Sequence, residues 1–194
     1  VRVVPHGNFI DVFPNDLTKA EARTRLGLGV DDFVYLFFGN ARAYKAIEVL
    51  IDAFASLRAE DAVLGLMMRD AFDPAYGRRL TELAGSRGGS VRVWTSSFFA
   101  AEEFQVYLNS ADVVVLPFSE VLTSGSAITA LGFGCPLVVP ALGCLSELVD
   151  DTMGITYPAN VDQALPRAME QIRRRDLVAA GIAARARAEA LSWD

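Results

Sequence analysis

The feature that most constrains the fold is an alternation of short apolar runs with longer, mixed segments along the chain. Most of the apolar runs are continuous and do not alternate with polar residues, which is typical of strands covered on both faces in a parallel sheet. The strands predicted in this way span residues 1–4, 33–39, 62–68, 91–94, 112–118, 135–140 and 154–158.

Helix-like segments fill the intervals between these runs. They span residues 17–26, 46–57, 74–84, 101–109, 126–133 and 144–149, and two helices rich in Ala and Arg are predicted after residue 161. This order predicts an α/β fold of βαβ units with a Rossmann-like, doubly wound parallel sheet, in which ligands bind outside the carboxyl ends of the strands. No repeat or low-complexity linker interrupts the chain, so we expect one domain over residues 1–194.

The charge balance argues against a nucleic-acid partner. The chain has 24 acidic and 18 basic residues, a formal net charge of -6, whereas binding along a phosphate backbone needs a basic surface. An anionic ligand of smaller size needs only a local positive site, because salt screens charges that lie more than about 8 Å away. The net charge therefore leaves a nucleotide ligand open.

Cysteine and histidine content limits the metal chemistry. Cys135 and Cys144 lack a Cys-x-x-Cys spacing, and His6 is the single histidine, so a multi-histidine zinc site is excluded and we expect no metal. Two cysteines of this kind are typical of buried residues in a reducing compartment, which favours a cytoplasmic location. No apolar run reaches the roughly 20 residues that span a bilayer.

A pair of cations follows the strand in "FFGNARAYKAIEVLIDAF", residues 37–54. The strand ends at Gly39 and Asn40, and Arg42 and Lys45 lie three residues apart at the start of the next helix. Each cation opposes the helix dipole there by about 0.3 to 1 kcal/mol, but a charge-assisted hydrogen bond to an anion contributes about 1.5 to 3 kcal/mol. The pair is consistent with a diphosphate site, and two solvated surface cations are the alternative.

A second candidate anion site follows the strand in "DVVVLPF", residues 112–118. The next residues are Ser119 and Glu120, and then "LTSGS" places Thr123, Ser124, Gly125 and Ser126 at the start of a small, apolar helix. Free amides at a helix start, together with the helix dipole, bind phosphate without a metal. An ordinary helix start capped by Ser or Thr is the alternative.

The glycine fingerprint of nicotinamide dehydrogenases is missing. "GSRGGS" (85–90) has the wrong spacing and precedes a strand, and "GFGCPL" (132–137) lies at a helix end. A Gly-x-Gly-x-x-Gly turn between the first strand and its helix is what such enzymes use to approach a pyrophosphate. The sequence therefore disfavours a dinucleotide oxidoreductase.

Taken together, these segments resemble the C-terminal donor-binding domain of family-4 (group 1) glycosyltransferases of the GT-B fold. Four blocks carry the resemblance in the family's order: "VVPHGNFIDVFP", "RTRLGLGVDDFVYLFFGNARAYKAIEVLIDAF", "LNSADVVVLPFSEVLTSGSAITALGFGCPLVVP" and "LSELVDDTMGITYPA". The resemblance implies catalytic roles for Arg42, Lys45 and Glu120. It also implies that the donor diphosphate contacts Gly39, Asn40, Arg42, Lys45 and the residues Thr123, Ser124, Gly125 and Ser126.

The function implied by this resemblance is metal-independent hexosyl transfer from a nucleotide-diphosphate sugar. The sequence begins at Val1 and stops at "LSWD", so we expect a fragment whose own N-terminal domain, which would hold the acceptor, is missing. The fragment alone is expected to be inactive, and any peripheral membrane contact is expected through that domain. A non-catalytic nucleotide-binding or interaction module is the alternative function.

The sequence departs from the family pattern at two positions. Typical members carry two glutamates eight positions apart, and the register places Val121 and Thr129 there. Glu120 lies one residue early and substitutes for the first glutamate in this interpretation. Thr129 can offer a hydroxyl to the ribose, but it cannot accept two hydrogen bonds from the ribose hydroxyls through two oxygens, as a carboxylate can.

Two further positions are candidates for the cleft. His6 and Gly7 follow the first predicted strand, and His6 is read either as a catalytic base or, preferably, as a donor contact or structural residue. The segment "SSFFAAEEF" (96–104) resembles the family's nucleobase loop, in which backbone groups near Phe98 and Phe99 would hold the base. Phenylalanines in the hydrophobic core are the alternative for this segment.

Overall fold

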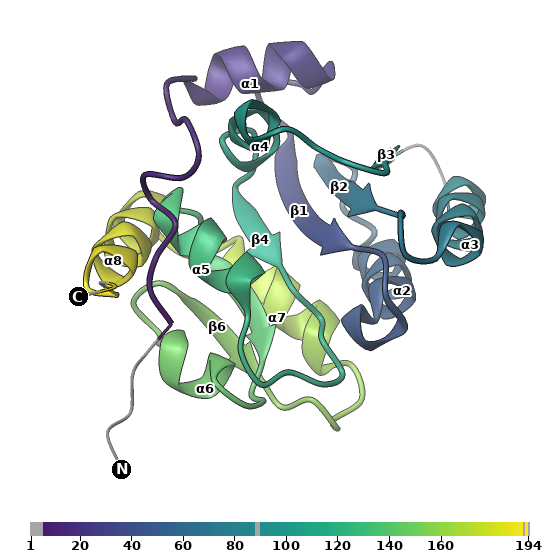
Figure 1. Ribbon diagram of the computed structural model, residues 1–194. Helices are drawn as coiled ribbons and strands as arrows, with labels where there is room; N and C mark the ends of the chain where they lie inside the picture. Colours follow the sequence, from purple (N-terminus) through teal and green to yellow (C-terminus); the bar gives the residue numbers. More distant parts are fainter. Residues whose placement is uncertain (1–5, 88–89, 192, 194) are drawn as a thin grey trace.

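The computed structural model describes residues 6–87, 90–191 and 193, and it contains one parallel sheet of six strands (Figure 1). The strand order is β3-β2-β1-β4-β5-β6, which confirms the predicted doubly wound sheet. The predicted strand at residues 1–4 lies outside the described residues. The bounds are β1 Phe33–Asn40, β2 Ala62–Arg69, β3 Val91–Ser96, β4 Val113–Val115, β5 Leu137–Pro140 and β6 Gly154–Tyr157.

Helices cover both faces of the sheet. On one face α2 packs against α3 and α7, whereas on the other α1 packs against α4 and α5 against α8 (Figure 1). Each predicted helix is present, with ends that differ by one or two residues from the prediction. The bounds are α1 Lys19–Leu26, α2 Ile47–Leu57, α3 Pro74–Ser86, α4 Ala101–Leu108, α5 Gly125–Gly132, α6 Leu145–Leu148, α7 Ala164–Ile172 and α8 Leu177–Glu189.

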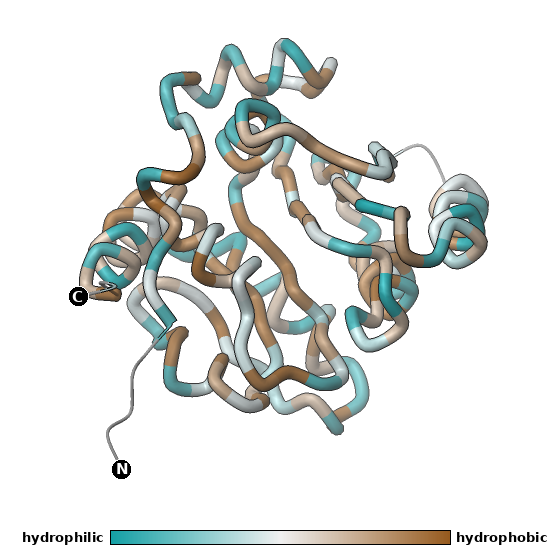
Figure 2. Tube along the Cα trace, in the orientation of Figure 1, coloured by the Kyte–Doolittle hydropathy of each residue, from teal (hydrophilic) through white to brown (hydrophobic). Residues whose placement is uncertain are grey.

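The core follows the central strands. Val113, Val114 and Val115 of β4 are fully buried, and so are most residues of β1 and β2. Figure 2 shows the same distribution, with hydrophobic residues along the central strands and more hydrophilic ones on the outer helices. Continuous apolar runs are therefore buried on both sides, as the pattern predicts.

The strand order reverses between β1 and β4. From β1 the chain continues into α2 on one face, and from β4 it continues into α5 on the other. Such a reversal leaves a crevice at the carboxyl ends of the two strands, because their following segments diverge. The segments that carry the predicted anion sites, residues 39–45 and 123–126, come directly after these two strands.

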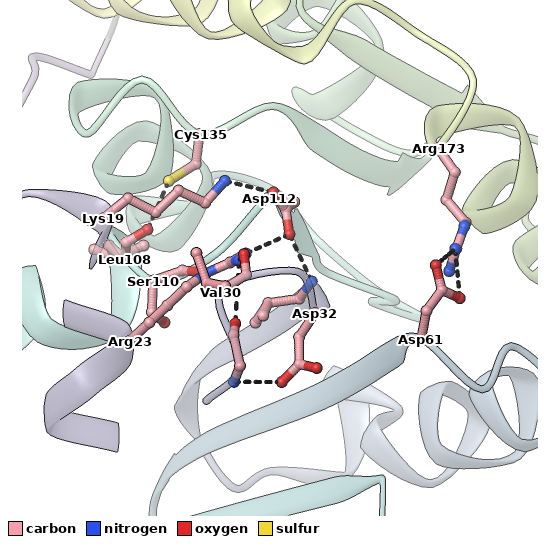
Figure 3. Close-up of polar contacts among 12 residues, drawn as sticks. Lys19, Arg23, Val30, Asp32, Asp61, Leu108, Ser110, Asp112, Cys135 and Arg173 are labelled. Carbon is pink, nitrogen blue, oxygen red and sulfur yellow. Dashed lines mark hydrogen bonds and ion pairs between the residues drawn. The ribbon is translucent and has the colours of Figure 1, made fainter. Parts of the chain in front are cut away.

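A buried charge network fixes α1 to the opposite, amino edge of the sheet (Figure 3). The carboxylate of Asp112 accepts hydrogen bonds from Arg23 at 2.8 Å and from the backbone amide of Val34 at 2.6 Å. Lys19 also forms an ion pair with Asp112. The Arg23 side chain is 6% exposed, and its other nitrogens donate to backbone carbonyl oxygens. These contacts join α1 to the starts of β1 and β4.

Candidate functional site

A cavity of about 530 Å³ lies at the carboxyl edge of the sheet, at the reversal between β1 and β4. Residues from the ends of β1 and β2, the start of α4, the start of α5 and the segment before α1 surround it. They are Phe9, Val12, Phe13, Phe38, Gly39, Asn40, Lys45, Met67, Arg69, Phe99, Phe104, Gly125, Ser126 and Thr129. Seven predicted site residues thus meet in one cavity: Gly39, Asn40, Lys45, Phe99, Gly125, Ser126 and Thr129.

The start of α5 presents two free amides to this cavity. Ser124 is the N-cap, and its hydroxyl oxygen accepts a hydrogen bond from the amide of Ala127 at 3.1 Å. Within the described part of the chain, the amides of Gly125 and Ser126 donate to no acceptor, as expected for the first positions of a helix. Because both residues line the cavity, they form a local positive site there.

Gly39 allows β1 to approach α5 closely. Its φ of +139° lies in a region that residues with a side chain rarely adopt. A Cβ atom at this position would lie 3.4 Å from the hydroxyl oxygen of Ser126. The glycine therefore brings the two predicted anion-binding segments within contact distance.

Lys45 is the buried cation of the site. The residue is 8% exposed, and its Nζ lies 3.7 Å from the centroid of the Phe118 ring. Among the residues that the structure describes, its ammonium makes neither an ion pair nor a hydrogen bond. Burial lowers the pKa of Lys45 from its usual value to about 8. A buried, unpaired cation on a cavity wall favours an anionic ligand.

The loop that carries Lys45 is tied to the loop after β4. The carbonyl oxygen of Tyr44 accepts hydrogen bonds from the Ser119 amide at 2.9 Å and from its hydroxyl at 3.2 Å. Ala46, with a φ of +48°, ends the short 3-10 turn at Ala43–Lys45 and starts α2. These contacts hold the Lys45 backbone in one position relative to the segment that leads into α5.

Arg42 does not line the cavity in this structure. Its guanidinium carbon lies 4.3 Å from the centroid of the Phe72 ring. Arg42 has extended backbone angles before the 3-10 turn, so it does not share a helical turn with Lys45 as the sequence suggested. The predicted convergence of the two cations on one side is therefore absent here, because Arg42 packs instead on the exposed Phe72 ring.

The remaining predicted residues also lie outside the cavity lining. Glu120 and Thr123 are exposed in the loop before α5. The His6 ring packs against Phe9 at 5.3 Å and against Trp193 at 5.2 Å between centroids. This aromatic cluster fixes the segment before α1, and through it Phe9, which does line the cavity.

The sequence prediction missed Arg69. It is the last residue of β2, pairs in register with Asn40 of β1 and lines the cavity. Its Nε donates to the carbonyl oxygen of Ser97 at 3.0 Å, which ties β2 to the loop after β3. The signal was present, because Arg69 ends an apolar run and the carboxyl ends of parallel strands lie at one edge.

The cavity has two chemically different ends. Lys45 and the start of α5 form a positive end, whereas Phe13 and Phe104, 4.6 Å apart between centroids, contribute to an aromatic wall. Phe99 belongs to this wall and packs against Tyr107 at 5.7 Å. Thr129, which is 6% exposed, lies on the α5 side. This arrangement suits a ligand with a flat apolar part and an anionic part.

Both thiols are free among the described residues, and neither lies in this cavity. Cys135 is buried, its thiol donates to the carbonyl oxygen of Leu108 at 3.3 Å, and burial raises the pKa of that thiol to about 12. Across residues 6–87, 90–191 and 193 no cluster of His, Cys, Asp or Glu could hold a metal ion. Over the same residues, no helix has the length and apolar character to cross a membrane.

The fold defines a doubly wound α/β protein of the GT-B glycosyltransferase type, with its candidate ligand cavity where the strand order reverses. Residues 32–175 match the family model described as "Glycosyl transferases group 1". The chain therefore belongs to the group 1 glycosyltransferase family, which confirms the resemblance seen in the sequence.

Relatives and solved structures agree with this family. The chain is 31% identical to D-inositol 3-phosphate glycosyltransferase of Xylanimonas cellulosilytica, covering 100% of this chain and 48% of that protein. It is 33% identical to the protein of that name from Geodermatophilus obscurus, covering 99% and 44%. The chain thus spans about half the length of these relatives.

Two solved structures illustrate the shared fold. Sucrose-phosphate synthase from Thermosynechococcus elongatus has a TM-score of 0.83 and 26% identity, over 99% of this chain and 49% of that chain. Anabaena HepE in complex with UDP and glucose has a TM-score of 0.80 and 21% identity, over 98% and 52%. Both alignments extend over nearly all of this chain.

Proposed function

We propose that this chain binds a nucleotide-diphosphate sugar in the cavity at the β1 and β4 ends, as the donor domain of a metal-independent glycosyltransferase. The proposal rests on one observation. The buried, unpaired Lys45 and the free amides of Gly125 and Ser126 belong to residues that line the same cavity. The HepE structure holds UDP and glucose, which supports a donor of this class. The acceptor is assigned to an N-terminal domain outside this chain.

The proposed mechanism rests on charge that develops on the leaving diphosphate. As the bond to the sugar breaks, the diphosphate gains negative charge, and preorganised positive groups stabilise this state more than the bound donor. Lys45 and the two amides supply these groups without a divalent metal. In the proposal Arg42 leaves the Phe72 ring to become a further diphosphate ligand, and Glu120 acts near the donor sugar.

The aromatic end of the cavity is assigned to the nucleobase in this proposal. Phe99 and Phe104 offer ring surfaces there, and Thr129 offers its hydroxyl to the ribose. Thr129 makes no side-chain hydrogen bond to the described part of the protein, so its hydroxyl is available. A cytoplasmic location, and membrane contact through the N-terminal domain, stay predictions.

A non-catalytic nucleotide-binding module is the second candidate function. Thr129 favours it, because a hydroxyl replaces the carboxylate that typical members place at this position. Activity of the full-length protein on a panel of nucleotide sugars separates the two functions. Transfer from any donor supports the enzyme, and binding without transfer supports the module.

Calorimetric titration of the chain with UDP, GDP, their glucose conjugates and NADH tests the proposal. We expect weak binding of at least one nucleoside diphosphate or its sugar, without transfer by this chain alone. Tight binding of NADH with no response to the diphosphates would overturn the assignment. The measurement needs no knowledge of the acceptor.

Replacing Gly39 should weaken nucleotide binding and destabilise the fold. In Gly39→Ala the new methyl group meets Ser126 and the backbone keeps a φ that alanine disfavours, a strain of about 1 to 3 kcal/mol. Urea unfolding and UDP titration measure the two effects. Gly85→Ala is the control, because Gly85 lies in α3 with open space around it. This substitution should raise the free energy of unfolding by about 0.4 to 1 kcal/mol.

A further inference from the structure

A second cavity, of about 380 Å³, opens at the same edge of the sheet but on the face covered by α2 and α7. We call it the α2–α7 cavity. It lies between these two helices and the ends of β4, β5 and β6. It shares no lining residue with the cavity of about 530 Å³ proposed to bind the nucleotide, which we call the nucleotide cavity. Its size falls in the range of small-molecule sites.

A buried hydroxyl without a partner lies in this cavity. Tyr157 is the last residue of β6, lines the α2–α7 cavity and is 7% exposed. Its hydroxyl makes no hydrogen bond to any residue that the structure describes, yet protein atoms do not seal the oxygen off completely. The hydroxyl is therefore free to donate to, and accept from, a molecule that enters the cavity, water included.

The other lining groups define the chemistry of that molecule. Pro117, Pro140 and Phe118 form an apolar surface, while the rim carries the amide and carboxylate groups of Asn160 and Asp162. Among the described residues that line it there is no Lys, Arg or His, in contrast to the nucleotide cavity. An anion would lack a partner there. A neutral ring can place its C–H groups on the apolar surface and donate its hydroxyl groups to the rim.

The carboxylates do not create a strong cation site. Asp52, which also lines the cavity, already pairs with Arg87 at 2.6 Å. Asp162 is exposed and accepts a hydrogen bond from the amide of Gln163 at 2.9 Å. Water and these two partners therefore compensate most of the negative charge of Asp52 and Asp162.

We propose that the α2–α7 cavity is a second binding site, for an uncharged hydroxylated ring of hexopyranose size. It is separate from the nucleotide cavity, but Phe118 lies between the two. Phe118 lines the α2–α7 cavity, and the Lys45 ammonium packs on the same ring. Ser119, whose amide and hydroxyl bind the Tyr44 carbonyl, also lines it. A ligand here contacts the loop that supports Lys45.

Titration of the ¹⁵N-labelled chain with methyl α-glucopyranoside tests the proposal by NMR. We expect saturable shifts at residues 157–163 and at the side-chain amides of Asn160 and Gln163. Tyr157→Phe should weaken binding about fivefold, the factor for one neutral hydrogen bond. Val49→Trp should abolish binding, because Val49 lines the cavity from α2 and is half exposed, so the larger ring fills the cavity without disturbing the core.

Val178→Trp serves as the matched control, because Val178 is also an exposed valine on a helix, α8, and does not line this cavity. The proposal would be overturned by shifts that do not saturate or by shifts centred on Gly39 and Gly125. It would also be overturned if the Tyr157→Phe and Val49→Trp variants bound the glucoside as tightly as the wild type. Tighter binding of glucuronate or of choline than of the neutral glucoside would also overturn it. The UDP titration reports on different residues, so the two proposals fail independently.

Discussion

The Lys45→Met variant is expected to bind UDP about 10- to 150-fold more weakly than the wild type, yet to resist urea better. Loss of binding follows from removing the proposed charge-assisted contact to the diphosphate, which would contribute about 1.5 to 3 kcal/mol. The gain in stability follows from burial, because the charged form of Lys45 is disfavoured in the folded protein and its pKa falls to about 8. Methionine keeps the unbranched chain and its contact with Phe118.

The expected gain in the free energy of unfolding at neutral pH is about 1 to 2 kcal/mol. A lowered pKa of this size represents a penalty of about 3 kcal/mol, and the cation–π contact with Phe118 offsets about 1 to 2 kcal/mol of it. Urea unfolding and UDP calorimetry on one preparation measure both quantities. A variant that loses stability and keeps its affinity would make Lys45 a structural residue.

Lys19→Met is the matched control, because Lys19 and Lys45 are the two lysines of the sequence. The Lys19 side chain is 48% exposed and pairs with Asp112 at the amino edge, away from the cavity. Its replacement should leave UDP affinity unchanged and reduce stability by no more than about 1 kcal/mol. If Lys19→Met weakened UDP binding as much as Lys45→Met, the loss would follow from the change in net charge and not from a specific contact of Lys45.

The pH dependence of UDP binding gives an independent readout of Lys45. With a pKa near 8, the side chain loses its charge as the pH rises through that value, so affinity should fall there. Stability should change in the opposite sense. Between about pH 8 and the ordinary lysine pKa, the unfolded chain binds more protons than the folded chain, so the contribution of Lys45 to stability rises with pH. Lys45→Met should lose both trends.

The alternation of apolar runs and helices was sufficient to predict the fold class but not the strand order. Each strand and helix predicted between residues 17 and 172 is present, because buried strands need continuous apolar runs. The strand predicted over residues 112–118 is shorter, since β4 ends at Val115 and the chain turns toward α5. The order β3-β2-β1-β4-β5-β6 depends on contacts between distant segments, which local pattern does not determine.

The candidate site was predictable where backbone geometry determines it. The helix start at Ser124 and the turn at Lys45 follow two strands whose carboxyl ends meet, so their convergence follows from the topology. Arg42 and Arg69 depend on side-chain contacts instead. Phe72, from the loop after β2, holds Arg42 outside the cavity, and strand register brings Arg69 beside Asn40. Neither contact has a signature within a short window of sequence.

The other large effect is expected at the amino edge of the sheet, where Asp112→Ala should lower the free energy of unfolding by about 3 to 5 kcal/mol. The substitution removes the carboxylate that pairs with Arg23 and accepts from the amide of Val34 (Figure 3). Arg23 is 5% exposed, so its guanidinium would remain as a buried charge without its counter-ion. The cost is therefore that of an uncompensated charge and not that of one surface ion pair.

Asp52→Ala is the control for Asp112→Ala, because it removes a carboxylate of the same type from an exposed pair. The Asp52 and Arg87 side chains are 55% and 45% exposed, so their pairing contributes no more than about 1 kcal/mol. Urea unfolding of both variants measures the difference. UDP affinity of folded Asp112→Ala should equal that of the wild type, since Asp112 and the cavity lie at opposite edges of the sheet. Similar losses of stability in the two variants would mean that burial of the Arg23 network contributes nothing beyond surface pairing.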